Sequence, residues 1–135
     1  MVLTIYTDGA SRGNPGKASY GFVVFNEEGQ QIYEEGEFLG VNTNNFAEYS
    51  AVVKAFEYLK KYNNEKLSVN FFMDSKLVAE QLSGRYKIKS LNLIPLANKI
   101  RKLEIGIKAV SYRHIPREMN TLADAMANKA LDALL

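Results

Sequence analysis

The order of strand-like and helix-like segments is the feature that most constrains the fold of this chain. Apolar and polar residues alternate over Val2–Thr7, and two similar runs within Ala18–Val41 flank a turn near Asn26–Gly29. This pattern predicts a strand followed by a hairpin. Further along, segments with helical spacing of apolar residues separate two more strand-like runs. The alternation predicts an α/β fold in which helices pack on a mixed sheet.

The later segments complete the predicted order β-β-β-α-β-α-α-β-α. Asn120 stands before the last helix as a candidate N-cap, and Pro116 ends the last strand. The predicted segments are a helix over Asn44–Asn63, a strand over Lys66–Asp74, helices over Ser75–Leu82 and Leu91–Leu103, a strand over Ile105–Ile115 and a helix over Asn120–Leu134.

The length and composition predict a single domain over residues 1–135. The chain is 47% hydrophobic and 24% charged, which is ordinary for a globular protein. It has no cysteine, so disulfides and thiolate metal sites are excluded. The sequence shows neither a membrane-length apolar run nor a secretory signal. We therefore expect a cytoplasmic protein that does not bind membranes, with a monomer as the default.

Charge is unevenly distributed along the chain. Ala18–Val53 contains six acidic residues and no lysine or arginine, whereas Gln81–Leu103 contains six basic residues and no acid. A basic stretch of this kind is typical of a surface that binds a polyanion. A helix and loop whose charges face solvent would show the same pattern, and charge alone favours that interpretation while leaving the first open.

Four acidic residues occupy unexpected positions. Asp8 directly follows the first predicted strand and Asp74 ends the fourth, and strand ends in open α/β sheets are common sites for ligands. Glu48 shares a helical face with apolar residues such as Val52, where an unpaired carboxylate is unfavourable. Stabilisation by the helix N-terminus is the alternative explanation for Glu48. Asp124 lies at the edge of the apolar stripe of the last helix, where it could also be solvated.

Carboxylates that converge from these positions would form a site for hard divalent cations. Oxygen ligands suit Mg²⁺ and Mn²⁺, and a chain with no cysteine and one histidine is a poor zinc binder. A pair of such ions is able to act on both the attacking and the leaving oxygen of a phosphodiester.

The glycine-rich segment Thr7–Ser19 has the composition of a phosphate-binding loop but not its pattern. A P-loop has glycine five residues before Gly-Lys and a serine or threonine directly after the lysine. Ser11 and Ala18 occupy those positions here, and a strand rather than a helix follows. We therefore expect no nucleotide cofactor, and a turn at Asn14–Gly16 is the remaining local interpretation.

Four motifs follow one another over almost the whole chain. They are TDGASRGNPG (Thr7–Gly16), TNNFAEYSA (Thr43–Ala51), MDSKLV (Met73–Val78) and RHIPREMNTLAD (Arg113–Asp124). Together they resemble type 1 ribonuclease H. The resemblance implies a ribonuclease H-like fold, with a five-stranded mixed sheet, an antiparallel second strand and helices on both faces. It also implies an endonuclease that hydrolyses the RNA strand of RNA–DNA hybrids and leaves 5′-phosphate and 3′-hydroxyl ends.

The resemblance assigns roles to individual residues. The four acids Asp8, Glu48, Asp74 and Asp124 would bind two Mg²⁺ ions, for which Mn²⁺ would substitute, and Asp8 would bridge both ions. His114 would move protons or help to release product. Contacts to the hybrid, including its 2′-hydroxyl groups, would come from Gly9, Ser11, Arg12, Gly13, Asn14, Thr43, Asn44, Asn45, Lys76 and Asn120.

The chain departs from many bacterial members of this family after the third acid. It has no tryptophan, and only SGRYKIKSLN (Ser83–Asn92) joins Leu82 to the next helix, so the basic tryptophan-containing extension of those members is absent. Hybrid binding would then rest on the basic residues of Arg85–Lys102 and on the active-site groove. Two alternatives stay open, a catalytically silent nucleic-acid-binding module of the same fold and a nuclease that also cuts double-stranded RNA.

Overall fold

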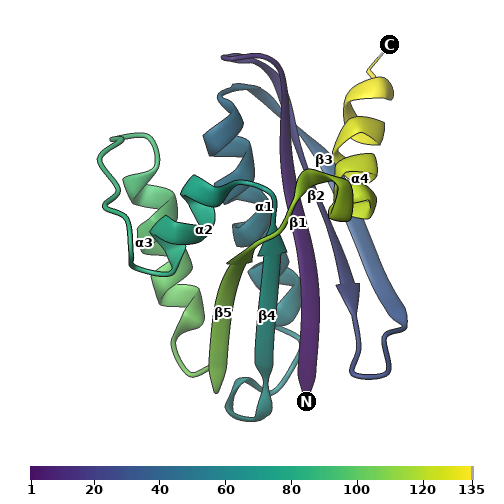
Figure 1. The fold of residues 1–135 in the computed structure, drawn as a ribbon, viewed down its shortest axis with the longest axis vertical. Helices are drawn as coiled ribbons and strands as arrows, with labels where there is room; N and C mark the ends of the chain where they lie inside the picture. Colours follow the sequence, from purple (N-terminus) through teal and green to yellow (C-terminus); the bar gives the residue numbers. More distant parts are fainter. Residues whose placement is uncertain (135) are drawn as a thin grey trace.

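A mixed five-stranded sheet lies at the centre of the computed structural model, which describes residues 1–134 (Figure 1). Across the sheet the strand order is β3-β2-β1-β4-β5. The strands are β1 (Val2–Gly13), β2 (Gly16–Phe25), β3 (Gln31–Asn42), β4 (Ser68–Met73) and β5 (Ala109–His114). The helices are α1 (Asn44–Leu59), α2 (Lys76–Leu82), α3 (Ile94–Glu104) and α4 (Thr121–Asp132), with short 3₁₀ turns at Asn64–Lys66 and Arg117–Met119.

The strand directions bring two acids to the same edge of the sheet. β2 is antiparallel to β1 and β3, whereas β4 runs parallel to β1 and β5. The register pairs Thr7 of β1 with Met73 of β4. Because the two strands run in the same direction, the next residues, Asp8 within β1 and Asp74 just after β4, are neighbours.

Helices cover the two faces of the sheet unequally. α1, α2 and α3 lie on one face, and α4 lies on the other in front of β1, β2 and β3 (Figure 1). The main core joins buried residues of the first three helices, such as Val52, Val78 and Ile100, to Ile5 and Phe71 of the sheet. The predicted five-stranded mixed sheet with helices on both faces is thus confirmed.

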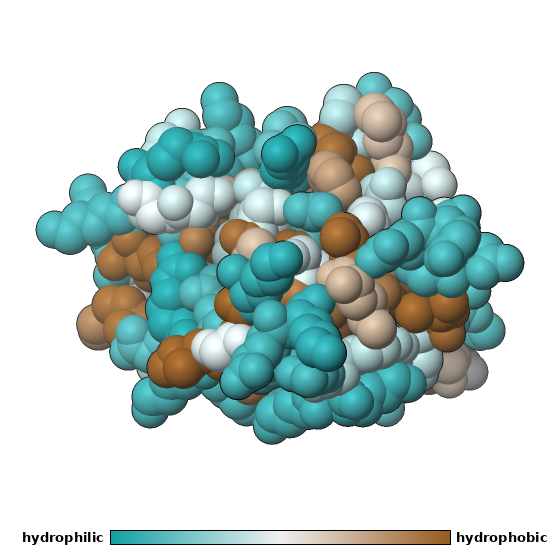
Figure 2. Space-filling view, turned by 90° about the horizontal axis from the view of Figure 1, so that it is seen from below, coloured by the Kyte–Doolittle hydropathy of each residue, from teal (hydrophilic) through white to brown (hydrophobic). Residues whose placement is uncertain are grey.

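The surface away from the carboxyl ends of β1 and β4 is largely hydrophilic. Figure 2 shows this end of the molecule, where hydrophobic side chains occur in small groups between hydrophilic ones. Among residues 1–134, no helix has both the length and the apolar character needed to cross a bilayer.

The first strand is longer than predicted. Its expected end was Thr7, but β1 continues to Gly13 and pairs residue by residue with β2 as far as Gly16. Only Asn14 and Pro15 form the turn, through a cis peptide bond. The glycine-rich segment is therefore mostly the end of a hairpin, because β2 supplies hydrogen-bonding partners that local composition does not reveal.

Other boundaries also differ from the prediction, and α3 begins at Ile94 rather than Leu91. α1 ends at Leu59 rather than Asn63, and α4 covers Thr121–Asp132. β5 begins at Ala109, not Ile105, because the chain turns at Gly106 with a φ of 87°. Asn120 is the N-cap residue of α4, as predicted, but its side chain makes no capping hydrogen bond. Its amide nitrogen instead donates to the backbone oxygen of Thr7 at 2.9 Å.

Glycines in β2 and β3 allow α4 to lie directly on the sheet. A Cβ atom added to Gly21 would lie 2.6 Å from both the carbonyl oxygen of Ala123 and the amide nitrogen of Ala127. One added to Gly36 would lie 2.5 Å from the carbonyl oxygen of Met126. The backbone of α4 therefore occupies the space that side chains would need.

We predict that Gly21→Ala lowers the free energy of unfolding by about 1–3 kcal/mol, because the new methyl group must displace helix backbone rather than a flexible side chain. Urea denaturation would measure the change. Lys129→Ala, at an exposed position of the same helix, is the matched control and should leave the urea midpoint nearly unchanged. Equal stability of the Gly21 variant and the wild type would contradict this close packing.

Candidate active site

Three carboxylates meet where β1, α1 and the segment after β4 come together. Asp8, Glu48 and Asp74 each offer an oxygen atom, and these atoms all lie within 4.8 Å of one another. Asp8 and Glu48 are buried, with 4% and 7% of their surface exposed, and Asp74 is half-buried. Three acids so close together and so poorly solvated form an unusual cluster.

Gly9 determines how closely Glu48 approaches Asp8. A Cβ atom added to Gly9 would lie 2.3 Å from the amide nitrogen of Glu48 and 2.4 Å from the carbonyl carbon of Ala47. The backbone of α1 therefore packs directly against β1 at this residue. The two acids come from distant parts of the sequence, and the missing side chain at position 9 permits their contact.

Mutual repulsion and burial disfavour the charged forms of these acids. Burial raises the pKa of Asp8 far above its usual range, and the charges of Glu48 and Asp74 raise it further. Burial, followed by the charge of Asp74, likewise raises the pKa of Glu48, although a hydrogen bond from the Gly9 backbone acts in the opposite direction. The metal-free cluster therefore retains protons at pH values where ordinary carboxyl groups are ionised.

The cluster fits a divalent cation. The buried Oε2 atom of Glu48 has no hydrogen-bond partner within the described residues, and an unpaired buried oxygen is unfavourable. The donors are all carboxylate oxygens, which hard cations such as Mg²⁺ and Mn²⁺ prefer. A bound cation would satisfy the unpaired oxygen and offset the repulsion among the three acids.

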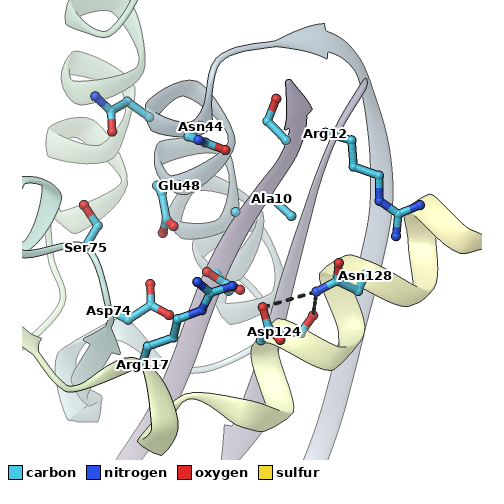
Figure 3. Close-up of a pocket in the computed structure, with 13 residues that line it drawn as sticks. Ala10, Arg12, Asn44, Glu48, Asp74, Ser75, Arg117, Asp124 and Asn128 are labelled. Carbon is cyan, nitrogen blue, oxygen red and sulfur yellow. Dashed lines mark hydrogen bonds between the residues drawn. The ribbon is translucent and has the colours of Figure 1, made fainter. Parts of the chain in front are cut away.

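Asp124 joins the site from the opposite side of the sheet. Its carboxylate lies outside the group of three, but a hydrogen bond with Asp8 is among the causes that raise the pKa of Asp8. Asn128, one turn later on α4, donates to the Asp124 backbone oxygen at 3.0 Å and to its Oδ1 at 3.2 Å (Figure 3).

An open cavity of about 500 Å³ surrounds the acids. Figure 3 shows α1 on one side of it and α4 on the other, with β1 between them. The cavity exposes four carboxylates to a ligand large enough to reach both helices. Its lining includes nine of the residues predicted from the sequence, namely Asp8, Gly9, Ser11, Arg12, Asn44, Asn45, Glu48, Asp74 and Asp124.

The sequence prediction missed four residues that also line the cavity, Ala10, Ser75, Arg117 and Asn128. Figure 3 shows the Arg117 side chain extending into the cavity beside Asp74. Burial is the largest effect on the pKa of Asp74 and raises it, whereas the charge of Arg117 lowers it. Arg117 lies inside the motif RHIPREMNTLAD, which also contains Asp124. A cation in the same motif as a predicted metal ligand could have indicated that Arg117 lies near the site. Asn128 follows Asp124 by one helical turn, which was the corresponding signal for that residue.

His114 and Asn120 lie next to the cavity but do not line it. His114 is exposed at the end of β5, and its charge makes a minor contribution to lowering the pKa of Asp74. Asn120 is 1% exposed, and its side chain holds the segment before α4 to the backbone of β1 through Thr7. Its hydrogen bond to Asp74 lowers the pKa of that acid.

Several expected hybrid contacts already make hydrogen bonds within the protein. The Asn14 side chain accepts from the Asn44 amide at 3.1 Å, which ties the hairpin turn to the start of α1. Thr43 caps α1 by accepting from the amide of Phe46. The Arg12 guanidinium lies 2.5 Å from Oδ1 of Asp132, at the far end of α4.

The remaining expected contacts, Gly13 and Lys76, lie on the surface. Both are exposed, Gly13 at the end of β1 and Lys76 in the first turn of α2, and neither lines the cavity.

Three of the six cations in the basic stretch have acidic neighbours in space. Arg85 pairs with Glu80, Lys99 with Glu57 and Arg101 with Glu104, at distances of 2.5, 3.4 and 3.0 Å. Glu80 and Glu104 lie just outside the acid-free segment in the sequence, and the fold brings Glu57 of α1 to Lys99. The basic surface is therefore weaker than the sequence segment indicates.

Comparisons with known proteins agree with this geometry. A family model described as reverse transcriptase-like matches residues 6–130. The chain is 40% identical over 134 residues to the bifunctional protein Rv2228c of Mycobacterium tuberculosis, covering 98% of this chain and 36% of that protein. It is 39% identical over 127 residues to ribonuclease HI of Halobacterium salinarum, covering 94% of this chain and 63% of that protein. The chain thus spans about a third of the length of Rv2228c and under two thirds of the length of the Halobacterium ribonuclease HI.

The structural match extends over whole chains. The crystal structure of LC11-RNase H1 in complex with an RNA/DNA hybrid superposes with a TM-score of 0.93 at 37% identity and covers 98% of both chains. The shared sheet and the extent of these matches show that the chain belongs to the ribonuclease H family, type 1.

Proposed function

We propose that the chain is an endoribonuclease that hydrolyses the RNA strand of RNA–DNA hybrids and leaves 5′-phosphate and 3′-hydroxyl ends. The observation that carries the proposal is the convergence of Asp8, Glu48 and Asp74, with Asp124 at their edge, in an open cavity. The hybrid bound to the related LC11-RNase H1 supports the choice of substrate. Buried acids that repel one another destabilise the fold, and a module that only binds nucleic acid would gain nothing from them.

Two divalent cations are the proposed cofactors, with Mg²⁺ preferred and Mn²⁺ as a substitute. Asp8, Glu48, Asp74 and Asp124 would hold them, and Asp8 is the acid that faces all the others. The chemistry that such ions supply is to lower the pKa of the attacking water and to neutralise charge on the departing 3′-oxygen.

The protein's own side chains would orient the substrate and balance its charge. Arg117 is a cation on the cavity wall, where it would pair with the phosphate that reacts. Gly9 and Ser11 lie on the same strand as Asp8, close enough to the cavity for backbone groups to reach 2′-hydroxyls of the RNA. His114, exposed beyond the cavity, would exchange protons with solvent or help product to leave.

The substitution Asp8→Asn should abolish cleavage of the hybrid, by at least about a thousandfold, because the central ligand loses its charge. Digestion of labelled hybrid, RNA duplex and DNA duplex with Mg²⁺ or Mn²⁺ would measure activity and strand preference together. Glu65→Gln, an acid-to-amide change in the exposed 3₁₀ turn before β4, is the control and should leave cleavage unchanged. Persistent cleavage by Asp8→Asn would contradict the assignment. If the wild type binds the hybrid but does not cut it, the catalytically silent module is favoured. If it also cuts RNA duplex, the nuclease with relaxed specificity is favoured.

Stability without metal should fall as the pH rises. In the folded state the pKa values of Asp8 and Glu48 are raised, so the unfolded chain releases its protons first, and unfolding is favoured as the pH increases from about 4 to about 8. Urea denaturation in EDTA would follow this decline. At pH 8 in EDTA, Asp8→Asn should be more stable than the wild type by about 1–3 kcal/mol. Stability that rises over this pH range would show that the acids are not coupled as proposed.

Arg117→Ala should reduce kcat/KM by about ten- to a hundredfold, because the cavity loses the cation that would offset phosphate charge. His114→Ala should have a smaller effect, since His114 lies outside the cavity. Steady-state kinetics on a hybrid substrate would compare the two variants, and Arg117→Lys should recover part of the loss by restoring the charge. A larger effect at His114 than at Arg117 would reverse these roles.

A further inference from the structure

Two polar side chains on α4 face the cavity rather than the sheet. Asp124 and Asn128 lie one helical turn apart and both line the cavity (Figure 3). The neighbouring residues Ala123 and Ala127 are completely buried, and α4 packs on the glycines of β2 and β3. The helix that carries the two polar residues is therefore held firmly in place.

The Asn128 amide nitrogen makes two hydrogen bonds to the same residue. It donates to the backbone oxygen of Asp124 at 3.0 Å and to the Oδ1 atom of Asp124 at 3.2 Å. The first hydrogen bond holds the amide group against the helix backbone. The second therefore restrains the orientation of the Asp124 carboxylate. Oδ1 of Asp124 is thus engaged by Asn128, and Oδ2 is left for another partner.

Asp124 depends on such support more than the other three acids do. The oxygens of Asp8, Glu48 and Asp74 already lie within 4.8 Å of one another, and the carboxylate of Asp124 lies outside that group. It is half-buried, so packing around it leaves more freedom of rotation than at Asp8 or Glu48. The Asn128 side chain supplies a hydrogen bond to Asp124 from the same helix, at 3.2 Å.

We propose that Asn128 is a positioning residue, which holds the Asp124 carboxylate with one oxygen tied to α4 and the other directed toward the cation site. The inference rests on the proposed function and deepens it, because it assigns the fourth acid a partner that sets its orientation. Residues that orient a metal ligand typically change metal affinity or activity by about ten- to a hundredfold when they are removed. Asn128 acts through Asp124, so its loss should affect turnover more than substrate binding.

The first test measures Mn²⁺ binding by calorimetry without nucleic acid. Asn128→Ala should weaken the Mn²⁺ affinity about tenfold, while the urea midpoint stays close to that of the wild type. Asn128→Gln retains an amide donor at the same turn and should recover part of the affinity. Lys129→Ala, the adjacent exposed residue on α4, is the matched control and should bind Mn²⁺ as the wild type does. Unchanged Mn²⁺ affinity in Asn128→Ala would overturn the proposal.

The second test is a double-mutant cycle with Asp124→Ala. If Asn128 acts through Asp124, Asn128→Ala should have no further effect on Mn²⁺ affinity once the carboxylate is gone. On a hybrid substrate, the single variant should show a lower kcat with an unchanged KM. An equal loss in both backgrounds, or a change confined to KM, would mean that Asn128 contacts the substrate instead and would overturn the positioning role.

The two proposals fail in different ways. If the wild type binds Mn²⁺ with the predicted coupling between Asn128 and Asp124 but does not cut the hybrid, the positioning role stands and the proposed reaction is wrong. If the wild type cuts the hybrid but the coupling is absent, the reaction stands and the positioning role is wrong.

Discussion

The contact between the backbones of α1 and β1 at Gly9 is the constraint on which the site depends. No side chain separates the two elements there, since a Cβ atom on Gly9 would overlap the backbone of Ala47 and Glu48. Glu48 therefore enters the same buried space as Asp8, and the parallel pairing of β1 with β4 adds Asp74. The second close approach, of α4 to Gly21 and Gly36, brings Asp124 from the other face. The acids meet because glycines remove the layer of side chains that normally separates a helix from a sheet.

This arrangement is electrostatically unfavourable without a counter-charge. Burial and like charges raise the pKa values of Asp8 and Glu48, and an oxygen of Glu48 has no partner among the described residues. Asn120 and Arg117 offset part of the repulsion at Asp74, because both lower the pKa of that acid. The core formed by α1, α2 and α3 must therefore supply the stability that the site removes. Such a site gains most from divalent cations, which accept carboxylate oxygens as ligands and two of which would balance the charge of four carboxylates.

Sequence patterns predicted the parts of the structure that depend on local spacing. The order of strands and helices was predicted, and helical periodicity correctly placed Glu48 on the face of α1 that packs against the sheet. The extension of β1 to Gly13 was missed, because a glycine-rich segment becomes a strand only when a partner strand supplies hydrogen bonds. Asn120 is the N-cap residue of α4 as predicted, but its side chain bonds to the backbone of Thr7, distant in the sequence, instead of to the helix. The assignment of catalytic and hybrid-binding roles stays a prediction.

The sequence by itself determined which chemistry is available. It has no cysteine and one histidine, its acids follow strands or lie on apolar helical faces, and its four motifs identify the family. Only the tertiary structure decided which of these groups act together. It placed Arg117 and Asn128 in the cavity, left His114 outside it and brought Glu57 of α1 to Lys99 of the basic stretch. Spacing along a chain determines the face on which a side chain lies, whereas distances between faces depend on how closely the backbones pack.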